Sequence, residues 1–261
     1  MKRKMIVPGR QFALIFLLVS FAIVYYTIRK AQKGRVPKIR PFPAIEAIPE
    51  AVGRCAEMGR PIFAAPGMGE IETAWAAETI SGLNVVHYTA RHAAKAGVDV
   101  ISIVVRTPHI PLTQDAIRTA YLIEGTPERY RDDMVRFVPY GMAYDVTIMG
   151  VAERERPAAS VIVGTYWHPA LYTIEAMNAV GAMNIGGTSR TVMTPFFIGG
   201  CDYFLMGEEV LAAGAYVSPD PVPKGSFEGQ DIIKIVAGIL IIIGAIAVTF
   251  GSRIIENILR W

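Results

Sequence analysis

Two long apolar stretches lie near the ends of the chain. Residues 12–28 and 235–251 contain no charged side chain. Each comes close to the roughly 20 residues that an α-helix needs to cross about 30 Å of hydrocarbon. A helix in a soluble domain normally keeps one polar face, and these stretches have none. Together with Lys234, which can extend its amine toward lipid headgroups, the pattern predicts membrane-spanning helices at 12–28 and 232–251.

The first apolar stretch has a second interpretation, as a cleaved secretory signal. Lys2, Arg3 and Lys4 precede it, as basic residues precede the apolar part of a signal peptide. The following residues, TIRKAQKGR, contain no small-x-small cleavage site. We therefore expect a retained anchor.

The central part of the chain alternates between two periodicities. Near-continuous apolar runs at 60–67, 98–105 and 159–164 predict strands that are covered on both faces, which is typical of a parallel sheet. Segments with a helical period lie between them, at 169–181, 114–125 and 71–96, the last with a break at Ser81-Gly82. The predicted fold class is α/β, with a mostly parallel sheet flanked by helices in a Rossmann-like three-layer domain between two transmembrane helices.

The domain organisation follows from these elements and from the prolines between them. A basic N-terminal tail is expected at 1–11, the first span at 12–28, a basic Pro-rich tether at 29–50, the α/β domain at 51–217, a second Pro-rich tether at 218–231, the second span at 232–251 and a C-terminal tail at 252–261.

The basic residues beside the spans suggest on which side of the membrane the α/β domain lies. Two spans put both termini on one side and the domain on the other, and the basic residues are nearly balanced between the sides. Six of them lie within 29–40 with no acid among them. We expect this block to contact anionic lipid and the chain to lie in the cell membrane, with the domain in the cytoplasm.

The remaining composition excludes some classes of protein. Two cysteines far apart, Cys55 and Cys201, indicate reduced thiols. A formal net charge of +3, with much of the basic excess beside the spans, gives no basic face for a nucleic acid.

The turns that follow the predicted strands are the expected place for a ligand. In a parallel sheet these turns meet at one edge, where helix N-termini also point. Glycine, hydroxyl and basic side chains there can hold an anion such as a phosphate. The candidate ligand-binding residues are Gly67, Gly69, Arg106, His109, Thr165, His168, Gly186, Gly187, Thr188, Ser189 and Arg190.

None of these turns carries a complete catalytic or cofactor motif. GMGEIE has Glu72 where a dinucleotide fingerprint has its third glycine, and GAMNIGGTS has Gly187 where a phosphate loop has lysine. The histidines lack the spacing of metal ligands, and no Gly-x-Ser-x-Gly elbow occurs. We therefore assign no catalytic residue, metal or cofactor, and favour a protein that is not an enzyme.

The turn GTYWHP at 164–169 illustrates the alternative to a ligand site. Thr165 ends a strand, and Pro169 suits the first turn of a helix. Tyr166 and Trp167 bring large apolar faces to the rim. The segment is first a corner between a strand and a helix, and the wall of a pocket is the second interpretation.

Three stretches resemble a known family. RPIFAAPGMGEIETAWAAETISGLNVVHYTARHAAKAGVDVISIVV, GTYWHPALYTIEAMNAVGAMNIGGTSR and IGGCDYFLMGEEVLAAGAYVS together look like an uncharacterised family of prokaryotic membrane proteins, a domain of unknown function. The resemblance covers nearly the whole region between the spans. It implies membrane association and no particular activity, so it transfers no site residue.

Two functional hypotheses remain. The first is a membrane-anchored α/β binding or assembly module, part of a homo-oligomer or a membrane-associated complex. Small residues on one face of the second span favour close helix packing in it, at Ala237, Gly244, Ala247 and Gly251. The alternative is a membrane-bound enzyme or sensor that uses the sheet-edge turns to bind a phosphorylated or lipid-linked small molecule.

Overall fold

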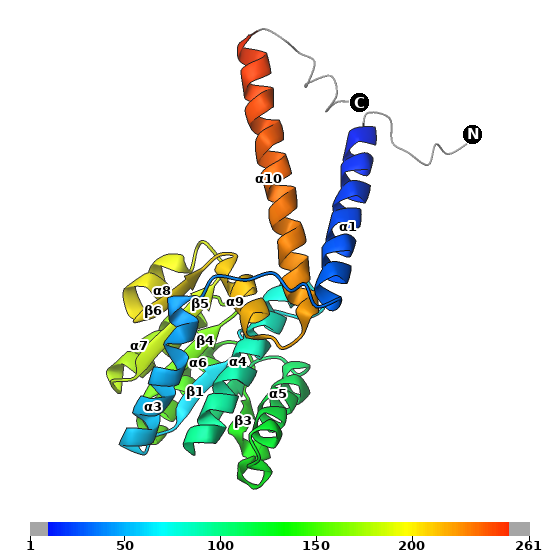
Figure 1. Ribbon diagram of the computed structural model, residues 1–261. Helices are drawn as coiled ribbons and strands as arrows, with labels where there is room; N and C mark the ends of the chain where they lie inside the picture. Colours follow the sequence, from blue (N-terminus) through cyan, green and yellow to red (C-terminus); the bar gives the residue numbers. More distant parts are fainter. Residues whose placement is uncertain (1–9, 251–261) are drawn as a thin grey trace, which may run out of the picture. The chain divides into compact units, whose positions relative to one another are not determined.

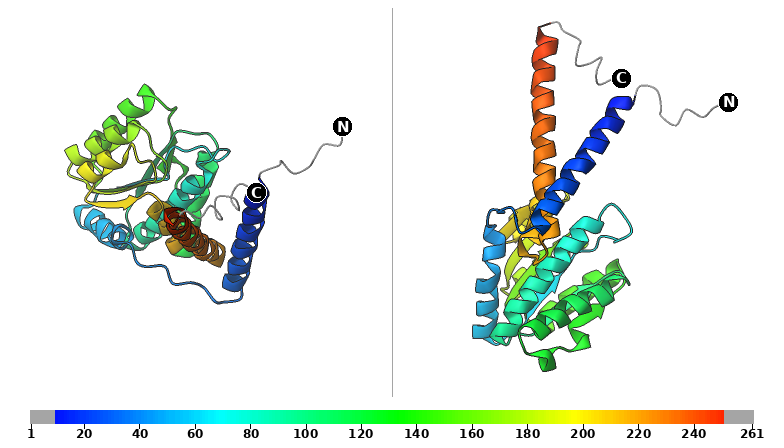
Figure 2. Two further views of the ribbon diagram at one scale, coloured as in Figure 1. Left: turned by 90° about the horizontal axis from the view of Figure 1, so that it is seen from above. Right: turned by 45° about the vertical axis from the view of Figure 1, so that its right-hand side comes forward.

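The computed structural model describes residues 10–250 (Figures 1 and 2). It divides into two compact units. The first, here called the head, comprises Arg40–Ser218, and the second comprises the two terminal parts of the chain. Each unit is described separately. The predicted N-terminal tail at 1–11, the end of the second span at Gly251 and the predicted C-terminal tail lie partly or wholly outside the described residues.

The terminal unit contains two helices that are long and apolar enough to cross a membrane, α1 (Gln11–Gln32) and α10 (Pro221–Thr249). Almost none of their apolar residues is covered by other parts of the protein. The start of α10 is capped by Asp220, whose side chain accepts a hydrogen bond of 2.8 Å from the backbone N–H of Val222. Pro221 occupies the first helical position, where the missing N–H is not needed.

α1 and α10 pack against each other through two glycines spaced four residues apart. A Cβ atom on Gly225 would lie 2.8 Å from the Cβ of Ala31, and one on Gly229 would lie 2.7 Å from the hydroxyl of Thr27. The two backbones therefore approach as closely as in small-xxx-small helix pairs. Lys30 and Glu228 form an ion pair of 2.6 Å beside the contact. These glycines come before the small residues Ala237, Gly244, Ala247 and Gly251 in the chain. The packing of those four residues against another helix stays a prediction.

The head is built on a six-stranded parallel sheet in the order β3-β2-β1-β4-β5-β6. Its strands are β1 (Ile62–Ala65), β2 (Val100–Val104), β3 (Val135–Phe137), β4 (Ala159–Val163), β5 (Met183–Thr188) and β6 (Tyr203–Met206). All residues of β1, β2, β4 and β5 are buried, as continuous apolar strands require. The predicted fold class is confirmed, and the strand order is that of the doubly wound α/β fold.

Helices cover both faces of the sheet (Figures 1 and 2). The helices of the head are α2 (Pro43–Glu46), α3 (Ile48–Met58), α4 (Ala76–Ala96), α5 (His109–Ile123), α6 (Met142–Glu155), α7 (Pro169–Ala179), α8 (Thr194–Gly200) and α9 (Glu209–Val217), with short 3₁₀ turns at Pro127–Arg129 and Asp132–Met134. On one face α6, α7 and α8 enclose a core that includes Phe63, Ile103, Ile162 and Phe197. α3, α4, α5 and α9 form the other layer, in which α4 contacts the remaining three.

Two sequence-based expectations about local structure are wrong. The helix expected from residue 71 begins at Ala76, and it runs through Ser81 and Gly82 without a break. The reason is that Gly82 is a packing position: a Cβ there would lie 2.4 Å from the carbonyl oxygens of Pro66 and Val163. The glycine lets α4 lie directly against the ends of β1 and β4.

The other correction concerns residues 186–190, which were expected to form a turn. Gly186, Gly187 and Thr188 belong to β5 and are buried. A Cβ on Gly186 would lie 2.6 Å from both the Cys201 sulfur and the Phe197 ring. Glycine stands in this strand because neighbouring side chains fill the space beside it.

The expected tethers contain helical residues as well as extended ones. The range 29–50 includes the end of α1, all of α2 and the start of α3. In the range 218–231, α10 begins at Pro221.

Candidate functional site

The centre of the sheet edge lies where the chain changes direction, between β1 and β4. β1 is followed by α4 on one face, and β4 is followed by α7 on the other. At such a switch point the two loops leave the sheet on opposite sides, and ligands of doubly wound folds bind between them. The loop after β1 starts at Pro66, and the loop after β4 starts at Gly164.

These two loops are joined through their backbones. The N–H of Met68 donates a hydrogen bond of 2.7 Å to the carbonyl oxygen of Thr165. Gly67 has a φ of 93°, and a Cβ on it would lie 2.8 Å from the backbone nitrogen of Thr165. Both the positive φ and the close approach require glycine here. The loop backbones therefore form a rigid floor for the edge.

A buried polar network lies beneath this floor. The Thr165 hydroxyl donates a hydrogen bond of 2.5 Å to a carboxylate oxygen of Glu78 in the first turn of α4. The Thr79 hydroxyl donates to the carbonyl oxygen of Gly69 at 3.0 Å. Thr79 and Thr165 are fully buried and Glu78 nearly so. The network ties the N-terminus of α4 to the turn after β4, so it fixes the positions of both loops.

His109 is buried beside the network, at the start of α5. Its side chain is 0% exposed, and neither ring nitrogen has a hydrogen-bond partner within the described part of the chain. Burial lowers the pKa of His109, and the nearby charge of Arg106 lowers it further, while the backbone of Gly69 acts in the opposite direction. The imidazole is therefore neutral at physiological pH.

The lowered pKa of His109 makes the head less stable in acid. An unfolded histidine takes up a proton near pH 6.5, whereas folded His109 resists protonation until a lower pH. Below about pH 6.5 the unfolded state thus binds more protons than the folded state. The free energy of unfolding therefore decreases as the pH is lowered, by up to about 1.4 kcal/mol per pH unit per proton.

Chemical denaturation of the detergent-solubilised chain at pH 7.5 and pH 5.5 measures this loss of unfolding free energy. In His109→Gln the loss of stability between these pH values should be smaller. The remaining loss should come from half-buried His92, whose pKa is also lowered by burial. An unchanged loss in His109→Gln would contradict this origin.

Arg190, in the turn after β5, lies against two tryptophans. The centre of its guanidinium group lies 4.9 Å from the ring centroid of Trp75 and 5.0 Å from that of Trp167. No carboxylate of residues 10–250 lies within ion-pair distance of it. The two indoles meet edge to face, with ring centroids 6.0 Å apart, so Arg190 contacts both rings from one side of the pair. These cation–π contacts restrict the guanidinium and leave N–H groups as donors.

A second arginine lies on the other side of the switch point, after β2. Arg106 forms an ion pair of 2.9 Å with Glu70, and its guanidinium lies 5.7 Å from the ring centroid of Tyr140. The Tyr140 hydroxyl is 3.4 Å from Nδ1 of His168, a long contact, and the two rings meet edge to face. One arginine with aromatic neighbours thus lies on each side of the switch point, Arg190 with two tryptophans and Arg106 with Tyr140.

The structure brings most of the predicted residues to one edge of the sheet. Those that follow carboxyl ends of strands are Gly67, Gly69, Arg106, His109, Thr165, His168, Ser189 and Arg190. Gly186, Gly187 and Thr188 lie within β5 instead, although the Thr188 hydroxyl accepts a hydrogen bond from the backbone N–H of Arg190. The glycine-containing segment 199–202 precedes β6 and so lies at the opposite edge of the sheet.

Sequence reasoning missed three residues of the site. Trp75, Glu78 and Tyr140 contact Arg190, Thr165 and Arg106 respectively. Trp75 and Tyr140 lie at the ends of long connections, and no local motif marks them. Glu78 is an acid in the first turn of a helix. Because the helix dipole alone favours an acid there, its position did not mark it as part of a site.

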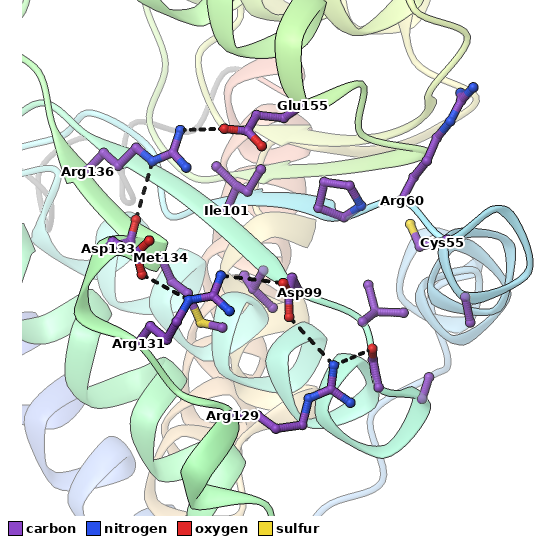
Figure 3. A pocket seen from close by; sticks show the side chains of 17 residues that line it. Cys55, Arg60, Asp99, Ile101, Arg129, Arg131, Asp133, Met134, Arg136 and Glu155 are labelled. Carbon is purple, nitrogen blue, oxygen red and sulfur yellow. Dashed lines mark hydrogen bonds and ion pairs between the residues drawn. The ribbon is translucent and has the colours of Figure 1, made fainter.

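A pocket of about 320 Å³ lies at the opposite, amino edge of the sheet (Figure 3). In Figure 3 Arg131 lies between Asp99 and Asp133, and Arg136 reaches Glu155. Each of these carboxylates is thus already paired with an arginine. The lining has four arginines, including Arg60, and three carboxylates, so most of its charge is neutralised within the pocket, which makes it a weaker candidate than the carboxyl edge.

Neither cysteine of the head provides a reactive thiol. Burial raises the pKa of Cys55, in its wall, to about 11, and burial with the neighbouring charge of Asp202 raises that of Cys201 to about 12. Neither thiol is a nucleophile at neutral pH. Within residues 10–250 no group of three histidine, cysteine or acidic side chains is arranged to hold a metal ion.

Comparison with protein families identifies the chain. The model of the family described as Domain of unknown function (DUF6754) matches residues 2–259. The chain belongs to this family. The resemblance to a family of unknown function is thereby confirmed, and that description assigns no role to any residue. Neither a curated protein nor a solved structure matches the chain.

Proposed function

We propose that the chain is a membrane-anchored binding module whose head holds a small anionic ligand at the carboxyl edge of the sheet. The observation that carries this proposal is Arg190, which lies against both Trp75 and Trp167 and has no carboxylate partner among the described residues. Contacts with both indoles restrict the guanidinium, and its N–H groups can bind a phosphate or carboxylate group with two parallel hydrogen bonds.

The neighbouring side chains support an anion over a cation. Arg106 and His168 stand on the far side of the switch point and add donors to the same edge. Glu70, the acid nearest to them, is already paired with Arg106. A ligand that bridges the two sides would meet Arg190 at one end and the N–H donors of the Arg106–Glu70 ion pair at the other.

Burial of the polar network favours binding over catalysis. Thr165 and Glu78 form a hydroxyl–carboxylate pair of the kind that activates nucleophiles, but Thr165 is 0% exposed. A hydroxyl that cannot reach a ligand acts on the structure of the site instead. The enzyme hypothesis would need an exposed group in this role.

Anchoring is supported by the terminal unit. α1 and α10 are long and apolar enough to span a bilayer, and they pair at Gly225 and Gly229. Their remaining apolar surface has no partner within the described chain, as expected for helices in lipid. In this proposal the head is held at a membrane, and the cell membrane, with the head in the cytoplasm, is the location that the basic residues of 29–40 favour.

Tryptophan fluorescence tests the ligand proposal directly, because two of the three tryptophans contact Arg190. The full chain, reconstituted in uncharged lipid vesicles, is titrated with inorganic phosphate and pyrophosphate. We expect a saturable change in emission, weakened about 10- to 100-fold in Arg190→Ala, since a charge-assisted pair contributes roughly 1.5–3 kcal/mol.

The matched control is Arg118→Ala, which removes an exposed arginine of α5. It should bind as the unaltered chain does. Equal binding by Arg190→Ala and the unaltered chain, or no saturable response to either anion, would overturn the proposed site.

A further inference from the structure

α6 exposes an apolar stripe to solvent. Met142, Val146 and Met149 are 82%, 62% and 45% exposed, and they follow one another at helical spacing on the outer side of α6. Leu171 and Tyr172 of the adjacent helix α7 are also exposed. Single exposed apolar residues are ordinary, but a contiguous group on neighbouring helices is typical of an interaction surface.

A groove borders this stripe. It lies between α6 and α7 and has a volume of about 500 Å³, and its lining includes Met149, Ala152, Glu153, Arg156, Tyr172 and Ala176. Three of its lining residues are alanines, and their small side chains leave room for an apolar side chain from outside. Met142, the most exposed residue of the stripe, lies ten residues, or about 15 Å, from Ala152 along α6.

We propose that this surface, here the α6–α7 face, binds a second copy of the chain. A protruding apolar side chain and a receiving groove on the same face are the requirement for a twofold, self-complementary contact. If two α6 helices pair antiparallel about a point between Val146 and Thr147, each Met142 lies over the groove of the other copy.

Small residues lie where the two helices would touch. In that register the exposed Ala143 of one copy faces Gly150 of the second copy. A Cβ on Gly150 would meet only the flexible end of the Arg154 side chain, so nothing rigid covers this position in a single chain. Two helices can therefore approach closely there.

Charge also favours a second copy. The rim of the groove carries acidic and basic side chains together, including Glu153 and Arg156. In the antiparallel register Glu153 lies beside the N-terminus of α6 in the second copy, where the helix dipole favours a carboxylate. Each α6–α7 face therefore supplies both the carboxylate and the helix N-terminus that this contact needs. The terminal helices add to the effect if they span a membrane, because copies confined to one bilayer meet at a raised effective concentration.

Cysteine cross-linking in native membranes tests the pairing. Val146→Cys places a thiol beside the twofold axis, and oxidation should give a disulfide-linked product of twice the chain mass. Val192→Cys is the matched control, because Val192 is 74% exposed in the turn before α8, away from the face. The described native cysteines are buried or half-buried, with raised pKa values, so they do not compete.

A second substitution separates pairing from folding. Gly150→Leu in the Val146→Cys chain should lower the cross-linked fraction about tenfold, because leucine blocks close approach of the helices. Far-UV circular dichroism and phosphate titration should not change, since Gly150 lies at the surface and apart from the sheet edge. A dimer that survives Gly150→Leu, a Val146→Cys chain that stays monomeric, or cross-linking to a different protein would each overturn the inference.

Discussion

Gly82→Ala is expected to destabilise the head by more than about 2 kcal/mol. In a helix interior this change alone would stabilise by roughly 0.5–1 kcal/mol, because glycine loses more conformational freedom on folding. At Gly82 the added methyl would lie 2.4 Å from the carbonyl oxygens of Pro66 and Val163. Both oxygens belong to backbone at the ends of central strands, so they cannot move aside cheaply. The steric penalty therefore exceeds the gain in helix propensity.

The matched control for this prediction is Gly53→Ala in α3. Nothing lies within 4 Å of a Cβ at Gly53, so only the propensity effect remains, and the variant should be slightly more stable than the unaltered chain. Urea denaturation followed by circular dichroism measures both variants. Gly82→Ala should also weaken phosphate binding, because displacement of α4 moves Glu78 away from Thr165. A Gly82→Ala chain as stable as Gly53→Ala would refute the packing role.

Replacement of both contact glycines of α10 is expected to separate it from α1. In Gly225→Leu/Gly229→Leu the new side chains would overlap Ala31, Thr27 and the α1 backbone at Ile28 and Val24, since each of these has an atom within 3 Å of the place that a Cβ would occupy. The ion pair between Lys30 and Glu228 cannot hold the helices together alone, since partly exposed pairs contribute at most about 1 kcal/mol. Packing therefore decides the outcome.

A short bismaleimide cross-linker measures this separation. In Lys30→Cys/Glu228→Cys it should join the two helices and give a chain that migrates differently in denaturing gels, because a long loop is closed. The leucine pair should abolish the shift. Gly238→Leu is the control: nothing lies within 4 Å of a Cβ at Gly238, so the cross-link should form as before. Cross-linking that persists in the leucine pair would show that the glycine contact does not hold the helices.

The central strands of the head were predictable because burial on both faces leaves a plain signal. The runs at β1, β2 and β4 are apolar except for one serine each in β2 and β4, and they follow one another with helical segments between them. β3 was missed since it has three residues, one of them Arg136. β5 was missed because Gly186 and Gly187 read as a turn. They stand there to admit Phe197 and Leu205, which depends on contacts between distant parts of the chain.

The sequence predicted where the candidate site lies, but it did not predict which side chains contact one another there. Parallel strands bring their carboxyl ends together, so residues such as Arg106, Thr165 and Arg190 could be assigned to one edge from strand endings alone. Which side chains contact one another there could not be derived. The two indoles that contact Arg190, Trp75 and Trp167, come from loops 92 residues apart, and the packing of α4 against β4 brings them together.

The two ends of the head lie at the same helix, and this determines an order of folding. Arg40 pairs with Glu209 at the start of α9, Phe42 packs on Tyr216, and Ser218 follows the last turn of α9. In the unfolded chain, the contact between Lys30 and Glu228 would have to close a loop of 198 residues. Once the head has folded, its ends are neighbours and the loop is effectively short. We therefore expect α1 and α10 to pair only after the head has folded, and a head that misfolds should leave the two helices apart.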